Sequence, residues 1–320
     1  MKVLIAGGAG YVGSPMARHL WEAGHDVTVF DKMAFGAESL VSLLGQERFT
    51  LIKGDIRDAE AVNQAVAGHD AVVLLAAIVG EPACNRDPDL ARDTNLGGAR
   101  NLLNAAQAAG VSRFAFASTC SNYGVADTSA PVTETAPLNP ISVYSETKVT
   151  AEEEILAANA PGFTTTVLRL STAFGISPRM RFDLLVSDFT WAAVRDHKIE
   201  IYGEQFWRPF VHVNDIAKAF GMVLTADPEA VGGDVFNVGA NHNNTQKSEL
   251  GQSVKNHYPE AEIAYVKRDQ DPRSYRVDFA KINDRLGYQP DWTIDDGIAE
   301  LRVAFEAGVW PDPDDARYRN

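Results

Sequence analysis

Short apolar runs alternate with segments of helical periodicity through the first half of the chain. The apolar runs predict buried strands at Lys2–Ala6, Asp26–Phe30, Thr50–Lys53, Ala71–Leu75, Arg113–Ala117 and Thr165–Leu168. Between them, apolar residues recur at helical spacing, most clearly in Leu90–Ala109 and Val143–Ala158. Alternating strands and helices predict an α/β fold, with a doubly wound parallel sheet covered by helices on both faces.

The regular alternation ends near Pro178. Beyond it, a helical stretch at Phe182–Asp196 and short strands at Ile199–Tyr202 and Val235–Val238 follow a less regular order. We therefore expect residues 1–174 to form the sheet domain and residues 175–320 to form mainly a smaller lobe. Residues 213–238 are expected to return to the main sheet.

Composition narrows the class of protein. With 320 residues and 45% apolar content, the chain can bury a full core. A net charge of −14 argues against nucleic-acid and membrane-surface roles. Two cysteines provide no disulfide framework, and the longest apolar run, Ala71–Val79, is too short to span a bilayer. The chain also begins directly with a strand and lacks a signal-type segment, so we expect a cytoplasmic protein.

Glycines follow the first strand at a spacing that favours dinucleotide binding. Gly7, Gly10 and Gly13 allow a tight turn and a close backbone approach to a pyrophosphate at the start of a helix. Asp31 ends the second strand, where an acid can bind the ribose hydroxyls and would repel the 2′-phosphate of NADP. Lys32 is a counter-signal, so NAD is favoured and NADP stays open.

A second motif indicates proton transfer. Tyr144 and Lys148 are four residues apart and therefore face the same side of one helix. A lysine ammonium beside a phenol lowers the pKa of the phenol toward the working range of a base. Ser118 and Thr119 lie at the carboxyl end of the fifth strand, where α/β sheets bind ligands. We interpret the Thr119 hydroxyl as a partner of the substrate alcohol and of Tyr144.

Together these motifs resemble the extended short-chain dehydrogenase/reductase family, and within it the nucleotide-sugar epimerases and dehydratases. The resemblance runs through almost the whole chain and includes the segments 118–124 and 208–215. It implies a Rossmann lobe that holds NAD, a C-terminal lobe that binds a nucleotide-diphosphate sugar, and a homodimer formed through Leu90–Ala109 and Val143–Ala158.

The resemblance also assigns roles to individual positions. The expected catalytic residues are Tyr144, Lys148 and Thr119. The expected NAD-binding residues are Gly7, Gly10, Tyr11, Val12, Gly13, Asp31, Lys32, Asp55, Ile56, Leu75, Ala76, Ala77, Asn95, Ser118, Tyr144 and Lys148. The expected substrate-binding residues are Glu81, Thr119, Cys120, Ser121, Thr172, Arg179, Arg181, Arg208, Arg268 and Arg273. No metal site is expected, because the two cysteines have no histidines nearby.

Several of these assignments have a plainer alternative. A surface ion pair is the alternative for each arginine, and only Arg208 lies in a motif that clearly favours binding; Arg179 and Arg181 could equally form a salt bridge between the lobes. For Cys84, near the expected sugar pocket, we favour simple packing.

One departure from the family separates its activities. The 4,6-dehydratases carry Asp-Glu directly after the catalytic Thr, where this chain has Cys120 and Ser121. Dehydration is therefore disfavoured, as is C5 epimerisation. The segments 78–84 and 174–186 resemble the branch with GDP-heptose 4-dehydrogenases and sugar 4-epimerases. We expect C4 redox chemistry, most simply 4-epimerisation; 4-dehydrogenation and 4-ketoreduction use the same residues and stay open. The intact catalytic residues argue against a non-catalytic NAD sensor.

Overall fold

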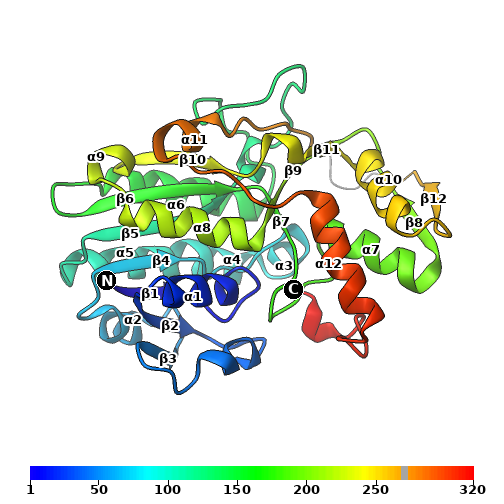
Figure 1. Ribbon diagram of the computed structural model, residues 1–320. Coiled ribbons are helices and arrows are strands. Elements are labelled where there is room, and N and C mark those ends of the chain that lie inside the picture. The colour runs from blue at the N-terminus through cyan, green and yellow to red at the C-terminus, as the bar shows by residue number, and fades with distance from the viewer. Residues whose placement is uncertain (268–272) are drawn as a thin grey trace.

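A parallel sheet forms the centre of the computed structural model, which describes residues 1–267 and 273–320 (Figure 1). In the described residues the sheet has seven strands, in the order β10-β6-β5-β4-β1-β2-β3, and every neighbouring pair is parallel. The strands are β1 (Lys2–Ala6), β2 (Asp26–Asp31), β3 (Phe49–Lys53), β4 (Ala71–Leu74), β5 (Arg113–Thr119), β6 (Thr164–Leu170) and β10 (Asp234–Val238). The predicted doubly wound α/β class is confirmed.

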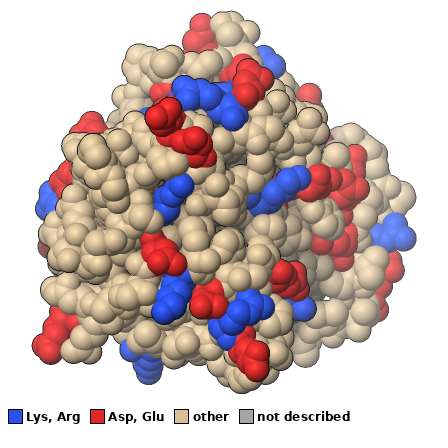
Figure 2. Space-filling view, turned by 60° about the vertical axis from the view of Figure 1, so that its left-hand side comes forward, with Lys and Arg blue, Asp and Glu red and all other residues tan. Residues whose placement is uncertain are grey.

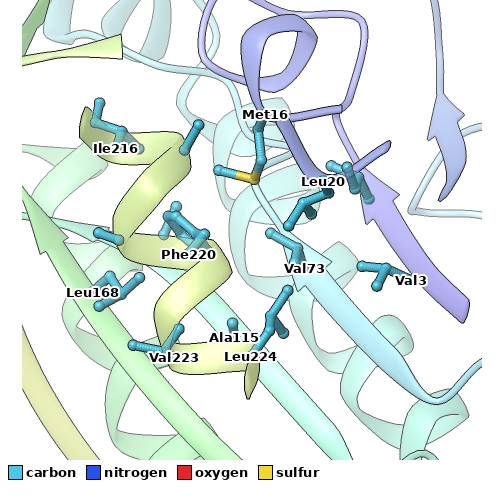
Figure 3. Close-up of a cluster of buried hydrophobic side chains, with 14 of the residues drawn as sticks. Val3, Met16, Leu20, Val73, Ala115, Leu168, Ile216, Phe220, Val223 and Leu224 are labelled. Carbon is cyan, nitrogen blue, oxygen red and sulfur yellow. The ribbon is translucent and has the colours of Figure 1, made fainter. Parts of the chain in front are cut away.

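Successive side chains of each strand enter two different cores, as the period of a strand requires. Val3 and Ile5 face helices α1 (Gly13–Glu22) and α8 (Val213–Thr225). Leu4 and Ala6 face the side covered by α2 (Ala59–Val66), α5 (Gly98–Ala108) and α6 (Val143–Ala157). Figure 3 shows the first core, where α1 and α8 pack over the strands through Met16, Leu20, Ile216, Phe220, Val223 and Leu224. Each large side chain buried there contributes roughly 1.5–3 kcal/mol.

A further core lies beside the carboxyl ends of the strands. It includes Phe174, Phe182, Phe210 and residues of α7 (Leu185–Asp196), α10 (Lys247–His257) and α12 (Ile294–Glu306). Small sheets accompany it: β7 (Thr172–Phe174), β9 (Trp207–His212) and β11 (Asn244–Gln246) form one, and β8 (Lys198–Ile201) and β12 (Glu262–Tyr265) form the other. Tyr11 from the glycine turn belongs to this core. The domain boundaries themselves stay a prediction.

The segment predicted as one helix, Leu90–Ala109, is helical but interrupted. It consists of α4 (Pro88–Arg92), the π-helical turn η2 (Asp93–Gly97) and α5. Asn95 in this turn is 4% exposed, and its side chain accepts a hydrogen bond from Ile78 N (2.7 Å) and donates one to Ile78 O (3.0 Å). The spacing of apolar residues does not predict such a turn, because the turn is stabilised by the contact of Asn95 with a loop that is distant in the sequence.

The remaining elements are short. They are α3 (Glu81–Arg86), α9 (Pro228–Val231), α11 (Ala280–Leu286), η1 (Glu38–Leu43), η3 (Cys120–Tyr123), η4 (Asn241–Asn243) and η5 (Ala316–Tyr318). Among the described residues, none of the helices combines the length and the apolar character needed to cross a membrane. On the face in Figure 2, basic side chains lie next to acidic ones instead of forming one basic surface.

Candidate active site

The glycine turn between β1 and α1 packs so closely against other backbone that side chains would not fit. Gly7 has a φ of +89°, and a Cβ on it would lie 2.6 Å from Ala76 N. A Cβ on Gly13 would lie 2.2 Å from the carbonyl oxygen of Gly7. Helix α1 begins at Gly13 with no side-chain cap; Ser14 N donates to Gly10 O (3.0 Å) and Pro15 has no N–H, so an anion would bind the N–H groups just before Ser14. The turn therefore has the features of a pyrophosphate site.

Hydrogen bonds connect this turn to the segment after β7. The Tyr11 hydroxyl donates to Gly175 O (2.7 Å), and the Ser177 hydroxyl donates to Tyr11 O (2.7 Å). Burial raises the pKa of Tyr11 above its usual range, so the phenol remains a donor. The Tyr11 side chain thus anchors the turn, which leaves its backbone for a ligand. Sequence reasoning missed Ser177, since a lone serine after a strand carries no signal.

Asp31 ends β2 beside the turn and orders it. Its carboxylate accepts hydrogen bonds from Ala9 N (2.9 Å) and Met33 N (2.7 Å). Lys32, which the sequence left as a possible NADP signal, pairs with Asp55 at 3.2 Å. Hydrogen bonds from Arg57, together with Lys32, hold the pKa of Asp55 well below its usual range. The charge of Lys32 is therefore balanced locally.

The other residues expected near the cofactor line the same region. Leu75 N and Ala76 N both donate to Ala6 O at 2.9 Å, which brings the loop after β4 against the glycine turn. Ile56 is buried and packs under Gly98 of α5. Asn95 fixes the following part of the same loop, as described above. These contacts leave backbone atoms of the loop facing the turn.

Helix α6 brings the predicted catalytic pair to the end of β5. Ser142 caps the helix in a capping box with Ser145, which places Tyr144 in the first turn. Lys148 is 3% exposed; its Nζ donates to Ala117 O (2.8 Å) and lies 5.9 Å from the centre of the Tyr144 ring. Thr119, the last residue of β5, lies close enough to Tyr144 to lower the pKa of its phenol. The structure therefore brings Thr119, Tyr144 and Lys148 together.

The electrostatics of this group differ from the expectation. Burial raises the pKa of Tyr144 to about 12, and the charges that lower it come from Arg181 and Arg273. Burial also lowers the pKa of Lys148 to about 7, because its amine lies against the Phe116 ring (4.6 Å to the centre) in apolar surroundings. Lys148 is thus a marginal cation, and the prediction from the sequence that its charge lowers the pKa of Tyr144 differs from this environment.

The loop after Thr119 divides its side chains between the core and the site. Cys120 is 1% exposed, and its thiol donates to Arg169 O (3.3 Å); burial raises its pKa to about 12. It packs in a small apolar cluster with Tyr123 and Tyr275. This environment favours a packing role for Cys120 over the substrate contact expected from the sequence. Cys84 is also buried, and its thiol donates to Ile78 O (3.3 Å).

Ser121 faces a different group. Its hydroxyl accepts a hydrogen bond from Arg273 Nη1 (3.2 Å), and Arg273 Nε lies 3.3 Å from Glu81 Oε1. Glu81, Ser121 and Arg273, which lie far apart in the sequence, are thus brought together. The charge of Arg273 also lowers the pKa of Tyr144. Thr172 lies apart from them in β7, where it is paired with Phe210.

The remaining arginines have internal partners. Arg208 is 2% exposed and donates to Trp207 O (2.8 Å) and to Arg273 O. Arg179 donates to Arg319 O (3.1 Å) and stacks over the Phe35 ring (3.9 Å to the centre). Arg181 forms a two-bond ion pair with Asp183, with distances of 3.0 and 2.5 Å. Arg268 lies outside the described residues.

Ser118 has a partner that the sequence did not suggest. Its hydroxyl donates to Glu152 Oε2 (2.8 Å), and Glu152 is paired with Arg169. Both charged residues are buried in α6 and β6. No sequence signal marked them, because a Glu one turn after Lys148 and an Arg within a strand look like ordinary surface residues.

Comparison with known proteins agrees with this arrangement. A family model described as the NAD dependent epimerase/dehydratase family matches residues 3–239. A UDP-glucose 4-epimerase of Corynebacterium glutamicum is 31% identical, with 97% of each chain covered. The crystal structure of DesIV, a dTDP-glucose 4,6-dehydratase from Streptomyces venezuelae with NAD bound, has a TM-score of 0.86 at 26% identity and covers 97% of this chain and 98% of its own. A UDP-glucose 4-epimerase structure from Thermotoga maritima, with UDP-glucose, has the same TM-score at 27% identity and covers 97% and 100%.

Proposed function

Because this chain belongs to the NAD-dependent epimerase/dehydratase family, we propose that it inverts the configuration at C4 of a nucleotide-diphosphate sugar. The observation that carries the proposal is the grouping of Thr119, Tyr144 and Lys148 at the end of β5, at the same carboxyl edge of the parallel sheet as the glycine turn after β1. The relatives named above act on nucleotide sugars, as 4-epimerases or 4,6-dehydratases. The residues of this chain favour the first activity, as follows.

The described residues fit the cofactor of the family. A Cβ on Gly7 or Gly13 would collide with the protein's own backbone, so glycine is required for the tight turn that would hold a pyrophosphate, and Asp31 presents a carboxylate beside this turn. The amine of Lys148, which lies at the end of β5, would hold the nicotinamide ribose. When bound, NAD supplies hydride exchange with C4 of the sugar.

The protein's own part is to move a proton and to orient the sugar. Tyr144 takes the proton of the C4 hydroxyl during oxidation and returns it during reduction. Thr119 lies beside Tyr144 and would orient the same hydroxyl. A Tyr144 pKa near 12, which already includes the lowering by Arg181 and Arg273, is too high for an efficient base at neutral pH, so the positive charge of a bound nicotinamide would have to lower it further.

The loop argues against dehydration. Removing water across C5 and C6 needs a carbon base and an acid, which the 4,6-dehydratases supply as a Glu and an Asp. Here Cys120 is buried with its thiol bonded to Arg169 O, and Ser121 is a hydroxyl bonded to Arg273. Glu81 is a nearby carboxylate, and its pairing with Arg273 at 3.3 Å favours a binding role.

The experiment begins with mass spectrometry of ligands that copurify with the protein. UDP-, GDP-, dTDP- and ADP-sugars are then screened, and NMR identifies the configuration at C4 of each product. A product inverted at C4 without net NADH supports the proposal. A released 4-keto sugar with one NADH per turnover identifies a 4-dehydrogenase, and its reverse a 4-ketoreductase. Absence of turnover with every sugar, despite bound NAD, would refute enzymatic C4 chemistry.

A further inference from the structure

Behind the catalytic loop lies a buried ion pair that the proposed chemistry does not use. Glu152 of α6 is 2% exposed and Arg169 of β6 is 4% exposed. Arg169 Nε donates to both carboxylate oxygens, at 3.0 and 3.2 Å, and its Nη2 adds a third bond to Oε1. Desolvation makes such a pair no more stabilising, in many proteins, than apolar residues of equal volume. A contribution to stability alone therefore does not explain why Glu152 and Arg169 form a buried ion pair.

The contacts of this pair run to the loop that carries Thr119. Ser118 Oγ donates to Glu152 Oε2 at 2.8 Å, and Asn122 Nδ2 donates to Ser118 Oγ at 3.1 Å. On the other side, Arg169 Nη1 donates to the Tyr123 hydroxyl at 3.0 Å, and Arg169 O accepts from the Cys120 thiol. All four loop residues are buried. They flank Thr119 and Ser121, which face the site.

Glu152 also belongs to the helix that carries the catalytic pair. Tyr144, Lys148 and Glu152 are spaced by four residues and lie along one face of α6. One carboxylate therefore connects the helix that carries Tyr144 to the residue that directly precedes Thr119. The Tyr123 hydroxyl extends the connection by donating to Asn237 of β10 at 2.7 Å.

We propose that Glu152 and Arg169 are positioning residues, which hold the loop 118–123 against α6 so that Thr119 stays beside Tyr144. The proposal rests on the proposed function for its kinetic consequence, because only a proton transfer through Tyr144 makes this distance matter. A displacement of about 1 Å in such a group can cost a hundredfold in rate. The pair therefore acts through Ser118 and Thr119 without touching the substrate.

The test compares Glu152→Gln with a matched control, Asp215→Asn. Asp215 is a carboxylate of α8 that is 1% exposed, and it accepts hydrogen bonds from Asp291 N (2.8 Å) and Trp292 N (3.2 Å). Both variants keep the size of the side chain and remove a buried charge. For each we would measure the Tm, the NAD affinity, kcat and KM, and the amide hydrogen exchange of peptides that cover residues 118–124.

Glu152→Gln is expected to lower kcat by about ten- to a hundredfold, with KM and the NAD affinity changed by less than about threefold. Hydrogen exchange in 118–124 should become faster. Asp215→Asn should lower the Tm and leave kcat within about twofold of the wild type. In a Tyr144→Phe background, Glu152→Gln should have little further effect on kcat, because the proton transfer it positions is already lost.

A folded Glu152→Gln protein with nearly normal kcat would overturn the proposal, whatever its Tm. Equal loss of kcat in Asp215→Asn would also overturn it, since the effect would then be general destabilisation. If Glu152→Gln does not fold, Ser118→Ala is the deciding variant. It removes the hydrogen bond from Ser118 to Glu152 and leaves the Glu152–Arg169 ion pair intact, so an unchanged kcat would refute the positioning role. The exchange measurement needs no substrate. Unchanged exchange in 118–124 therefore refutes the loop anchor, even if the wild type were to prove inactive on nucleotide sugars.

Discussion

Replacing Lys148 with methionine is expected to stabilise the protein at neutral pH while impairing its activity. The amine is 3% exposed and lies against the Phe116 ring, and burial lowers its pKa from 10.5 to about 7. At a pH between these two pKa values, the Lys148 amine binds a proton in the unfolded chain but not in the native protein. Lys148 therefore destabilises the fold, fully below pH 7 and progressively less as the pH rises toward 10.5.

The magnitude follows from the two pKa values. Each pH unit between them is worth about 1.4 kcal/mol, and the native amine is half protonated at pH 7, so Lys148 costs about 4 kcal/mol of unfolding free energy at pH 7 and about 2 kcal/mol at pH 9. Methionine removes this cost but leaves Ala117 O without the donor it has in the wild type, which costs about 1–3 kcal/mol at every pH. The variant should thus be more stable by about 1–3 kcal/mol at pH 7 and about equally stable at pH 9.

The assay is urea unfolding of NAD-stripped wild type and variant at pH 7, 8 and 9. Lys53→Met, at an exposed position at the end of β3, is the control and should show a difference that does not depend on pH. A Lys148→Met difference that stays constant from pH 7 to 9 would refute the reasoning that the native amine is largely neutral. The same variant should bind NAD more weakly.

Three further outcomes are expected. Tyr144→Phe should lower turnover by about 10²–10⁴-fold with folding and NAD binding nearly intact; near-normal rates would point to Thr119 as the proton acceptor. Stripped protein should bind NAD about ten- to a hundredfold more tightly than NADP, because Asp31 would repel the 2′-phosphate. Equal affinities in a titration would mean that Lys32 leaves its ion pair with Asp55 and binds the 2′-phosphate. Substrate turned over in deuterated water should gain no deuterium at C5, as NMR can detect; its appearance there would make Glu81 or Cys120 a carbon base.

Local patterns in the sequence were enough for the core of the fold. The six predicted strands lie within one or two residues of their positions in the sheet, since a buried parallel strand is a continuous apolar run. Strands β5 and β6 extend further than predicted, through Thr119 and Leu170, because Arg169 and Ser118 are polar yet buried. The spacing of Gly7, Gly10 and Gly13 likewise predicted a turn with an exposed backbone, because the steric requirement is local.

What the sequence determined by itself is therefore the sheet, the glycine turn and the pairing of Tyr144 with Lys148 on one helix face. Only the tertiary structure decided that Cys120 points into the core, that Lys148 is a marginal cation, and that Glu152 and Arg169 are buried under the catalytic loop. The physical reason is the range of the interactions. Periodicity and steric limits act between near neighbours, whereas burial and charge pairing depend on residues that only the folded chain brings together.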